Sequence, residues 1–432
     1  MERIEIGFIG IAIVLGLIGI RVPIGAAMGA TAFFGIWVMM GWNVAAGVTR
    51  AIPYNLIGDW NLSAIPMFLL MSFIAVEAGL SRGLFGAARV LLNWLPGGLA
   101  SSTVVGAGLF ASASGSSVAT AAAFSRISSP EMLNAGYNKG LATGSVAAAG
   151  TLGALIPPSV LMIVFGIILN TPINALFIAG IIPGILTAVM FIALITVRCI
   201  INPDLAPKTK FDVSAEEKRA LIADAWPLPL LIAAVMGGIF TGIVTPTEAG
   251  AAGAFLALLL ALLRRQMSFA ILKKTAISTA AASAEIFIVV LGAALFSRFI
   301  GLATIPDWVI GAFVGFETWQ LLLLICVLLV VLGAFLESIS IMLLTLPILG
   351  PLLGAHDVNL IWFAIIVVKL LEIGLMTPPM GMNVFVIKSA LGNQVRLGEI
   401  FRGVSWFVVI DLITLALLLM FPMITLWLPG LM

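Results

Sequence analysis

The sequence predicts an all-α, polytopic membrane protein made of inverted repeats, with two re-entrant helical hairpins and broken helices. Three observations predict this fold class. Of the 432 residues, 62% are hydrophobic and only 9% are charged, whereas a soluble domain carries about 25% charged residues. Apolar runs of about 20 residues, the length that spans a bilayer, recur along the chain. Two further apolar regions are interrupted near their middles by small and polar residues.

The remaining bulk properties limit the classes of function. The net charge of +2 gives no sign of a nucleic-acid partner. Cys199 and Cys326 lie in separate apolar runs and form neither a metal-binding spacing nor a disulfide framework. The N-terminal segment lacks a basic region followed by a small-residue cleavage site. The first apolar run is therefore expected to be a retained helix and not a signal peptide.

The uninterrupted apolar runs predict spanning helices, and the two interrupted regions predict the hairpins. The spans are expected at about 5–20, 24–41, 60–79, 140–169, 173–200, 227–244, 248–265, 276–299, 358–388 and 403–428. The first hairpin is expected at about 97–125, with its interruption at 112–117, and the second at about 308–350, with its interruption at 333–340. Non-helical backbone at this depth must be buried in protein or line a cavity.

The basic residues predict the orientation, because cytoplasmic loops are enriched in Lys and Arg. One orientation puts all but four of the 21 basic residues on the cytoplasmic side. The exceptions are Arg3, Arg50, Arg298 and Lys369. The first hairpin then enters from the cytoplasm, the second enters from the periplasm, and both termini are periplasmic. The stretches 81–95 and 267–275 combine basic with apolar residues and predict short interfacial helices.

Four parts follow along the chain. They are an N-terminal membrane helix (1–23), a first repeat (24–201), a cytoplasmic loop with a linking helix (202–247) and a second repeat (248–432). The repeats carry helix breakers at matched positions with offsets of 221 to 223 residues, and the matched spans run in opposite directions. Paired interruptions of this kind point to the binding site of a secondary transporter, although a plain proline kink would explain either one alone. The matched positions are Pro23 with Pro246, Pro157 with Pro378, and Ser116 with Glu337.

The two interruptions contain the candidate binding groups. Residues 112–117 include four serines and no large side chain. Hydroxyls and freed backbone carbonyls are hard oxygen ligands for a cation such as Na⁺, and the N-terminus of a half-helix favours an anion. Close helix packing is the alternative explanation for these small residues. Glu337 is a candidate because intramembrane carboxylates are functional by default. It could support a cation site, carry a coupling proton, or hydrogen-bond the opposite hairpin tip.

Other charged groups in apolar runs are weaker candidates. Lys369 and Glu372 lie three residues apart on one helix and are expected to neutralise each other as a structural pair, with a role near the substrate as the alternative. Glu77 and Glu285 have no evident partner in the sequence. Arg298 is expected to extend towards the membrane interface.

Enzyme chemistry is disfavoured. The sequence contains no HExxH, CxxC or Walker motif. An intramembrane serine hydrolase would need a base, and the single histidine, His356, lies in a predicted loop beside Asp357. A membrane enzyme therefore stays the least favoured interpretation.

Four motifs, in order along nearly the whole chain, closely resemble those of the large membrane subunit of TRAP (tripartite ATP-independent periplasmic) transporters. They are Gly-Leu-Phe-Ala-Ser-Ala-Ser-Gly-Ser-Ser-Val-Ala-Thr at 108–120, Ala-Gly-Thr-Leu-Gly-Ala-Leu-Ile-Pro-Pro-Ser at 149–159, Phe-Leu-Glu-Ser-Ile at 335–339 and Thr-Pro-Pro-Met-Gly-Met-Asn at 377–383. The resemblance implies an elevator-type fold, in which a transport domain carrying the hairpins moves against a scaffold. It implies Na⁺-coupled uptake of a small organic acid such as sialic acid, a C4-dicarboxylate or a 2-oxo acid, without an organic cofactor.

The resemblance also implies partners and a location. The partners are a small four-helix membrane subunit, expected here as a separate chain, and a periplasmic substrate-binding protein. The location is the cell inner membrane. A stand-alone carboxylate symporter or exporter of the same superfamily, working without a binding protein, is the alternative.

Residue roles are implied by the same motifs. The first cation site would combine Ser114, Gly115 and Ser116 with Thr151 and Gly153, and the second would combine Glu337 and Ser338 with Met376 and Thr377. Substrate would lie between the two tips, near Ser112, Ser117, Pro157, Pro158, Pro378 and Asn383. This chain has Glu337 where the family often has Asp. Asn383 is also expected to hydrogen-bond the unwound stretch that precedes it.

Overall fold

A computed structural model describes residues 2–81, 83–207 and 214–432. All regular elements in these ranges are helices. Within them, seven helices are long and apolar enough to cross a membrane, or eight if the bent pair α8–α9 counts as one span. The predicted all-α, multi-span membrane fold is therefore confirmed. Arg82 of the basic clusters and residues 208–213 of the linking loop lie outside the described residues.

The first half of the chain contains the elements from α1 to α10. Their bounds are α1 (Arg3–Gly19), α2 (Ile24–Met40), α3 (Trp42–Ile57), η1 (Trp60–Ser63), α4 (Ala64–Glu77), α5 (Gly83–Leu92), α6 (Gly98–Ser114), α7 (Ser117–Asn134), α8 (Lys139–Leu155), α9 (Val160–Ile168) and α10 (Ile173–Ile201). Pro23 is the N-cap of α2, where its missing N–H costs no hydrogen bond. The first hairpin is α6–α7, and α8–α9 is a helix bent by 41° at the Pro-Pro break.

The second half begins after a linking segment made of η2 (Pro203–Leu205), α11 (Ala215–Ala225) and α12 (Pro227–Phe240). Its elements are α13 (Pro246–Leu263), α14 (Phe269–Leu302), α15 (Ile305–Phe313), α16 (Thr318–Gly333), α17 (Ser338–Ala355), α18 (Leu360–Met376), α19 (Met382–Leu391), η3 (Gly392–Gln394), α20 (Leu397–Met420), α21 (Met423–Leu426) and η4 (Pro429–Leu431). The pairs α16–α17 and α18–α19 correspond in order to α6–α7 and α8–α9.

Three local predictions are wrong. The separate interfacial helix expected at 267–275 is the start of α14, which continues unbroken for 34 residues because no Gly or Pro interrupts its first turns. The second hairpin is shorter than the expected 308–350 at its start, since 308–317 belong to α15 and the turn after it. Helix α3 was not expected, because Arg50 and Pro53 reduce the apolar character of its sequence.

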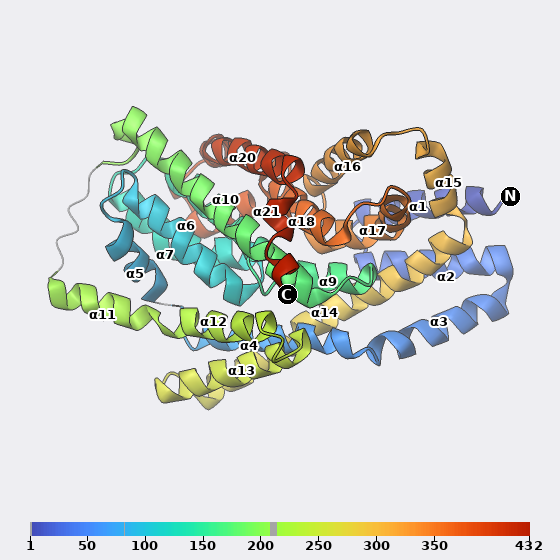
Figure 1. Cartoon of the computed structure of the whole chain (residues 1–432), viewed down its shortest axis with the longest axis horizontal. Helices are drawn as coiled ribbons and strands as arrows, with labels where there is room; N and C mark the ends of the chain where they lie inside the picture. Colours follow the sequence, from blue (N-terminus) through green and yellow to red (C-terminus); the bar gives the residue numbers. More distant parts are fainter. Residues whose placement is uncertain (1, 82, 208–213) are drawn as a thin grey trace.

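The helices form two groups, which pack against each other along one face. In the first group α2 packs against α14, α13 packs against α4, and α12 packs against α13. In the second group α8 is central and contacts α6, α7, α18 and α20. Figure 1 shows α4, α12 and α13 along one edge of the molecule, and α16 and α20 along the opposite edge. Contacts of α4 with α6 and of α14 with α17 join the groups, and the candidate site lies at this junction.

Candidate functional site

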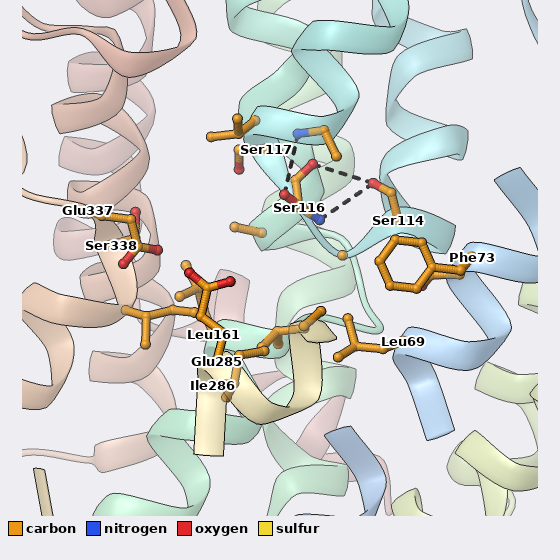
Figure 2. Close-up of a pocket in the computed structure, with 18 of the residues that line it drawn as sticks. Leu69, Phe73, Ser114, Ser116, Ser117, Leu161, Glu285, Ile286, Glu337 and Ser338 are labelled. Atoms are coloured by element: carbon orange, nitrogen blue, oxygen red, sulfur yellow. Dashed lines mark hydrogen bonds between the residues drawn. The ribbon is translucent and has the colours of Figure 1, made fainter. Parts of the chain in front are cut away.

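A cavity of about 450 Å³ lies between the two helix groups. One wall comes from α4 and α14, and the other comes from the tips of both hairpins with parts of α9 and α18. Figure 2 shows Ser116 and Ser117 of the first tip on one side, and Glu337 and Ser338 of the second tip on the other. The two interruptions, more than 200 residues apart in sequence, therefore face one space.

The first hairpin tip is a two-residue break between α6 and α7. Gly115 has a φ of 60°, the left-handed region that a side chain disfavours. Ser116 is the N-cap of α7, and its Oγ accepts a hydrogen bond from the Ala119 N–H at 3.3 Å. The Ser114 and Thr120 hydroxyls lie 2.8 Å apart and share a hydrogen bond. The Ser72 hydroxyl of α4 donates to the Ala113 carbonyl, which connects the other helix group to this tip.

The first tip packs directly on the break between α8 and α9. A Cβ added at Gly153 would lie 3.1 Å from the Ser116 carbonyl carbon, and one added at Gly115 would lie 3.3 Å from the Pro158 carbonyl oxygen. A side chain at either glycine would be tighter than ordinary van der Waals contact, so the two backbones would have to move apart by a few tenths of an ångström. The Thr151 hydroxyl donates to the Ala148 carbonyl of its own helix at 2.6 Å. The structure thus places Gly153 of the expected first cation site directly against the tip, whereas the Thr151 hydroxyl bonds within α8.

The second hairpin tip spans residues 334–337. Glu337 is the N-cap of α17, and its Oε2 accepts hydrogen bonds from the Ser340 N–H at 3.3 Å and from the Ser340 hydroxyl at 3.0 Å. The Ser338 side chain is buried and lines the cavity, and its hydroxyl has no hydrogen-bond partner among the described residues. Because an unpaired buried hydroxyl is costly, it marks a position where a ligand atom would be stabilising.

The second tip packs on the break between α18 and α19. A Cβ added at Gly374 would lie 2.5 Å from the Gly333 Cα, and the Met380 N–H donates to the Ala334 carbonyl at 3.2 Å. Gly153 and Gly374 differ by the same 221 residues as the Pro-Pro pairs, so each break presents a glycine to its own hairpin. Met376 is buried and the Thr377 hydroxyl donates to the Ile373 carbonyl at 2.7 Å.

The two breaks differ in their surroundings. Both Pro-Pro peptide bonds are cis. Pro157 and Pro158 are buried, whereas Pro378 and Pro379 are exposed. The first break is therefore enclosed by protein, and the second lies at the surface of the described chain.

The residues expected near substrate are only partly brought to the cavity. Ser117 lines it, whereas the Ser112 hydroxyl is buried against the Leu109 carbonyl at 2.7 Å. Pro157, Pro158 and Pro378 are not among the lining residues. The expected bond of Asn383 to the unwound stretch is wrong: its amide donates to the Ala147 carbonyl of α8 at 3.4 Å, because α19 packs on α8.

The expected pair of Lys369 with Glu372 is also wrong, because the two side chains find partners on different helices. Lys369 of α18 forms a buried ion pair with Asp411 of α20 and donates to the Thr187 hydroxyl of α10 at 3.1 Å. Glu372 instead accepts a hydrogen bond from the Ser117 hydroxyl at 2.6 Å. Sequence reasoning missed Asp411 entirely and did not place Glu372 at the hairpin tip.

Two more glutamates line the cavity from the first helix group. Glu77 of α4 forms an ion pair with Lys274 of α14 at 2.8 Å, a partner that the sequence did not indicate. Glu285 of α14 is exposed and points to the same space (Figure 2). No Lys, Arg or His is found among the described residues that line the cavity.

The cavity offers two kinds of polar group. The first turns of α7, α9 and α17 open onto it, and the N-terminus of a helix attracts anions. The carboxylates of Glu337 and Glu372, the serine hydroxyls and the carbonyls freed at the end of α6 supply oxygen ligands for a cation. A site of this composition can hold an anionic solute beside a cation.

Comparisons with known proteins show the family and the fold. Residues 11–424 match the family model described as Tripartite ATP-independent periplasmic transporter, DctM component. The chain is 33% identical over 378 residues to the C4-dicarboxylate TRAP transporter large permease protein DctM of Pseudomonas aeruginosa, with 86% of each chain covered. It is 33% identical over 429 residues to the sialic acid TRAP transporter large permease protein SiaM of Vibrio cholerae, with 96% of this chain and 97% of that one covered. Among solved structures, the fold is similar to that of the Alcanivorax borkumensis YdaH transporter, with a TM-score of 0.60, 15% identity and 98% of each chain covered.

Proposed function

Because the chain belongs to the DctM component family of tripartite ATP-independent periplasmic transporters and is a transport protein, not an enzyme, we propose that it imports a small organic acid with Na⁺ as the coupling ion. Its two relatives at 33% identity are named for different solutes, a C4-dicarboxylate and sialic acid. We therefore propose a class of solute, small carboxylates, and not one compound.

One observation carries this proposal: both hairpin tips face a single cavity at the junction of the two helix groups. Such a position suits alternating access, because sliding one group past the other would carry the tips and their ligands across the membrane. In this elevator-type scheme α2, α4, α13 and α14 belong to the scaffold, and the hairpins with α8, α9, α18 and α19 belong to the transport domain. Helix α2 of the first repeat packs against α14 of the second, and α4 of the first repeat packs against α13 of the second. This reciprocal packing supports two inverted repeats.

The cation ligands proposed are those at the two tips and at the breaks behind them. The contacts of Gly153 with Ser116 and of Gly374 with Gly333 support both sites. The proposed ligands are Ser114, Gly115, Ser116, Thr151 and Gly153 for the first cation, and Glu337, Ser338, Met376 and Thr377 for the second. The solute would lie between the tips, beside Ser117 and the first turns of α7 and α17, whose N–H groups favour its carboxylate.

Two partners complete the proposed system. A small membrane subunit and a periplasmic binding protein would act with this chain in the cell inner membrane, with both termini periplasmic. The names of its relatives, TRAP transporter large permease proteins, support this assignment. The binding protein would deliver the solute and account for much of the selectivity.

Solute uptake into proteoliposomes that contain both membrane subunits, with the binding protein added outside, tests the proposal. An inward Na⁺ gradient is expected to raise the initial rate about tenfold or more over an equal K⁺ gradient. Because loss of a hydrogen-bonding group at a half-buried site costs about 1–3 kcal/mol, Ser116→Ala and Glu337→Ala should each lower this rate about tenfold. Ser405→Ala, an exposed serine of α20, is the control and should leave the rate unchanged. Equal uptake with Na⁺ and K⁺ would refute the coupling.

A further inference from the structure

Glu372 is a buried carboxylate that forms no ion pair within the described residues. It is only 2% exposed on α18 and lines the cavity. Its hydrogen-bond partner is the neutral Ser117 hydroxyl, which donates to Oε2 at 2.6 Å. Burying an ionised carboxylate without a cationic partner is expensive, so such a group is either protonated or neutralised by a bound cation.

The nearest basic residue on the same helix is already engaged. Lys369 lies one turn before Glu372, but its ammonium group donates to Asp411 and to Thr187 on two other helices. With Asp411 fully buried, Lys369 and Asp411 together carry no net charge. An ionised Glu372 would therefore need its own cation, because Lys369 is already paired with Asp411.

Other oxygen groups face the same space. Glu337 and Ser338, at the start of α17, line the cavity together with Glu372 and Ser117. The Ser338 hydroxyl is 4% exposed and has no hydrogen-bond partner in the described part of the chain. A buried hydroxyl without a partner, in the same cavity as two carboxylates, lacks what a bound cation would supply, and carboxylate and hydroxyl oxygens are the ligands that Na⁺ favours.

We propose that Glu372, with Ser117 and Ser338, forms an additional monovalent-cation site that joins the two hairpin tips. This inference rests on the proposed function, since it deepens the role of the same cavity. The site differs from the two cation sites above, each of which lies between one hairpin and the break behind it. Here the first hairpin supplies Ser117, the second supplies Ser338, and α18 supplies the charge. Occupancy of this site would hold both tips around the solute.

Thermal unfolding of the purified chain, titrated with NaCl against choline chloride at constant ionic strength, tests the site without relying on transport. Na⁺ is expected to raise the Tm of the wild type. In Glu372→Gln the half-saturating Na⁺ concentration should rise about tenfold, because a charged ligand is lost. In Na⁺-free buffer this variant should unfold at the same temperature as the wild type or higher, since the unbalanced buried charge is gone. A purely structural role for Glu372 predicts the opposite, a lower Tm in both buffers.

Three further variants keep the test decisive. Ser338→Ala removes a hydroxyl that has no hydrogen-bond partner among the residues the structure describes. It should therefore fold normally and raise the half-saturating Na⁺ concentration about threefold or more. Glu285→Gln removes an equal charge from an exposed residue at the same cavity, and it should leave the Na⁺ dependence unchanged. If Glu372→Gln does not fold, Ser117→Ala decides, because Ser117 donates to Glu372 and belongs to neither of the two other cation sites. It should also raise the half-saturating Na⁺ concentration, and a wild-type value would overturn the additional site.

The failure of this inference is distinguishable from failure of the proposed function. Wild-type Na⁺ dependence in Glu372→Gln or Ser338→Ala would overturn the additional site, even if uptake is driven by Na⁺. A Tm of the wild type that does not respond to Na⁺ would overturn it as well. Shifted Na⁺ dependence in both variants would support the site, even if uptake proves indifferent to the Na⁺ gradient and the coupling proposal fails.

Discussion

Replacing Lys369 by methionine is expected to lower the free energy of unfolding by about 3–5 kcal/mol, because it leaves a buried carboxylate without its cation. Lys369 is 1% exposed and Asp411 is fully buried. The ammonium group also donates to Thr187 and lies 5.6 Å from the centre of the Phe191 ring. These contacts join α18 to α10 and α20. Loss of the Lys369 ammonium group would therefore weaken the packing that holds α18 at the break between α18 and α19.

The double variant Lys369→Met with Asp411→Leu is the matched control for this prediction. Removing both charges leaves no unpaired ion, and apolar replacements of buried ion pairs are often neutral. Most of the lost stability should therefore return. Thermal unfolding in detergent, followed by the fluorescence of the ten tryptophans, measures all three proteins. A single variant as stable as the wild type, or a double variant no better than the single one, would contradict the assignment of this pair.

Replacing Gly374 by alanine is expected to lower Na⁺-dependent uptake about tenfold or more while the protein remains in the membrane. The added Cβ would lie 2.5 Å from the Gly333 Cα and 2.7 Å from its carbonyl carbon, distances that force the two backbones apart. Overpacking of this kind costs about 1–3 kcal/mol. The end of α16 would move with the Ala334 carbonyl, which accepts the Met380 N–H, and the second tip would be displaced.

Gly354→Ala, in α17 of the hairpin that Gly374 contacts, is the control for Gly374→Ala. A Cβ at Gly354 would meet nothing within 4 Å. This variant should transport like the wild type, and uptake by proteoliposomes with equal amounts of each protein compares the two. Normal uptake by Gly374→Ala would mean that the close approach of α16 to α18 does not determine the position of the second tip.

The sequence was sufficient to predict the helical membrane fold and the positions of the helix breaks. Composition alone requires lipid as the main solvent, and Pro-Pro pairs and the serine-rich run interrupt helices for local reasons. The start of the second hairpin was misplaced, because α15 is as apolar as the spans around it. The continuity of α14 was missed because Lys273 and Lys274 suggested a surface segment, whereas Lys274 pairs with Glu77 of α4.

The partners of the charged residues could not be predicted, since tertiary packing chooses them. Lys369 and Glu372 have the spacing of a helical ion pair, but Asp411 comes from a helix 42 positions further along the chain. Ser117 meets Glu372 across 255 residues. No periodicity or spacing encodes such contacts between residues far apart in sequence. The same holds for the hydrogen bond from Ser72 to the first tip.

Protection of cysteines at both hairpin tips by Na⁺ is the most direct test of the central claim, that the two tips share one cation-dependent cavity. Ala119→Cys in α7 and Ile339→Cys in α17 both line the cavity and are not proposed ligands. Each would be made without the buried Cys199 and Cys326 and labelled with a polar thiol reagent in NaCl or choline chloride. We expect Na⁺ to slow labelling at both positions with the same half-effective concentration. Protection at only one tip, or at neither, would contradict the account.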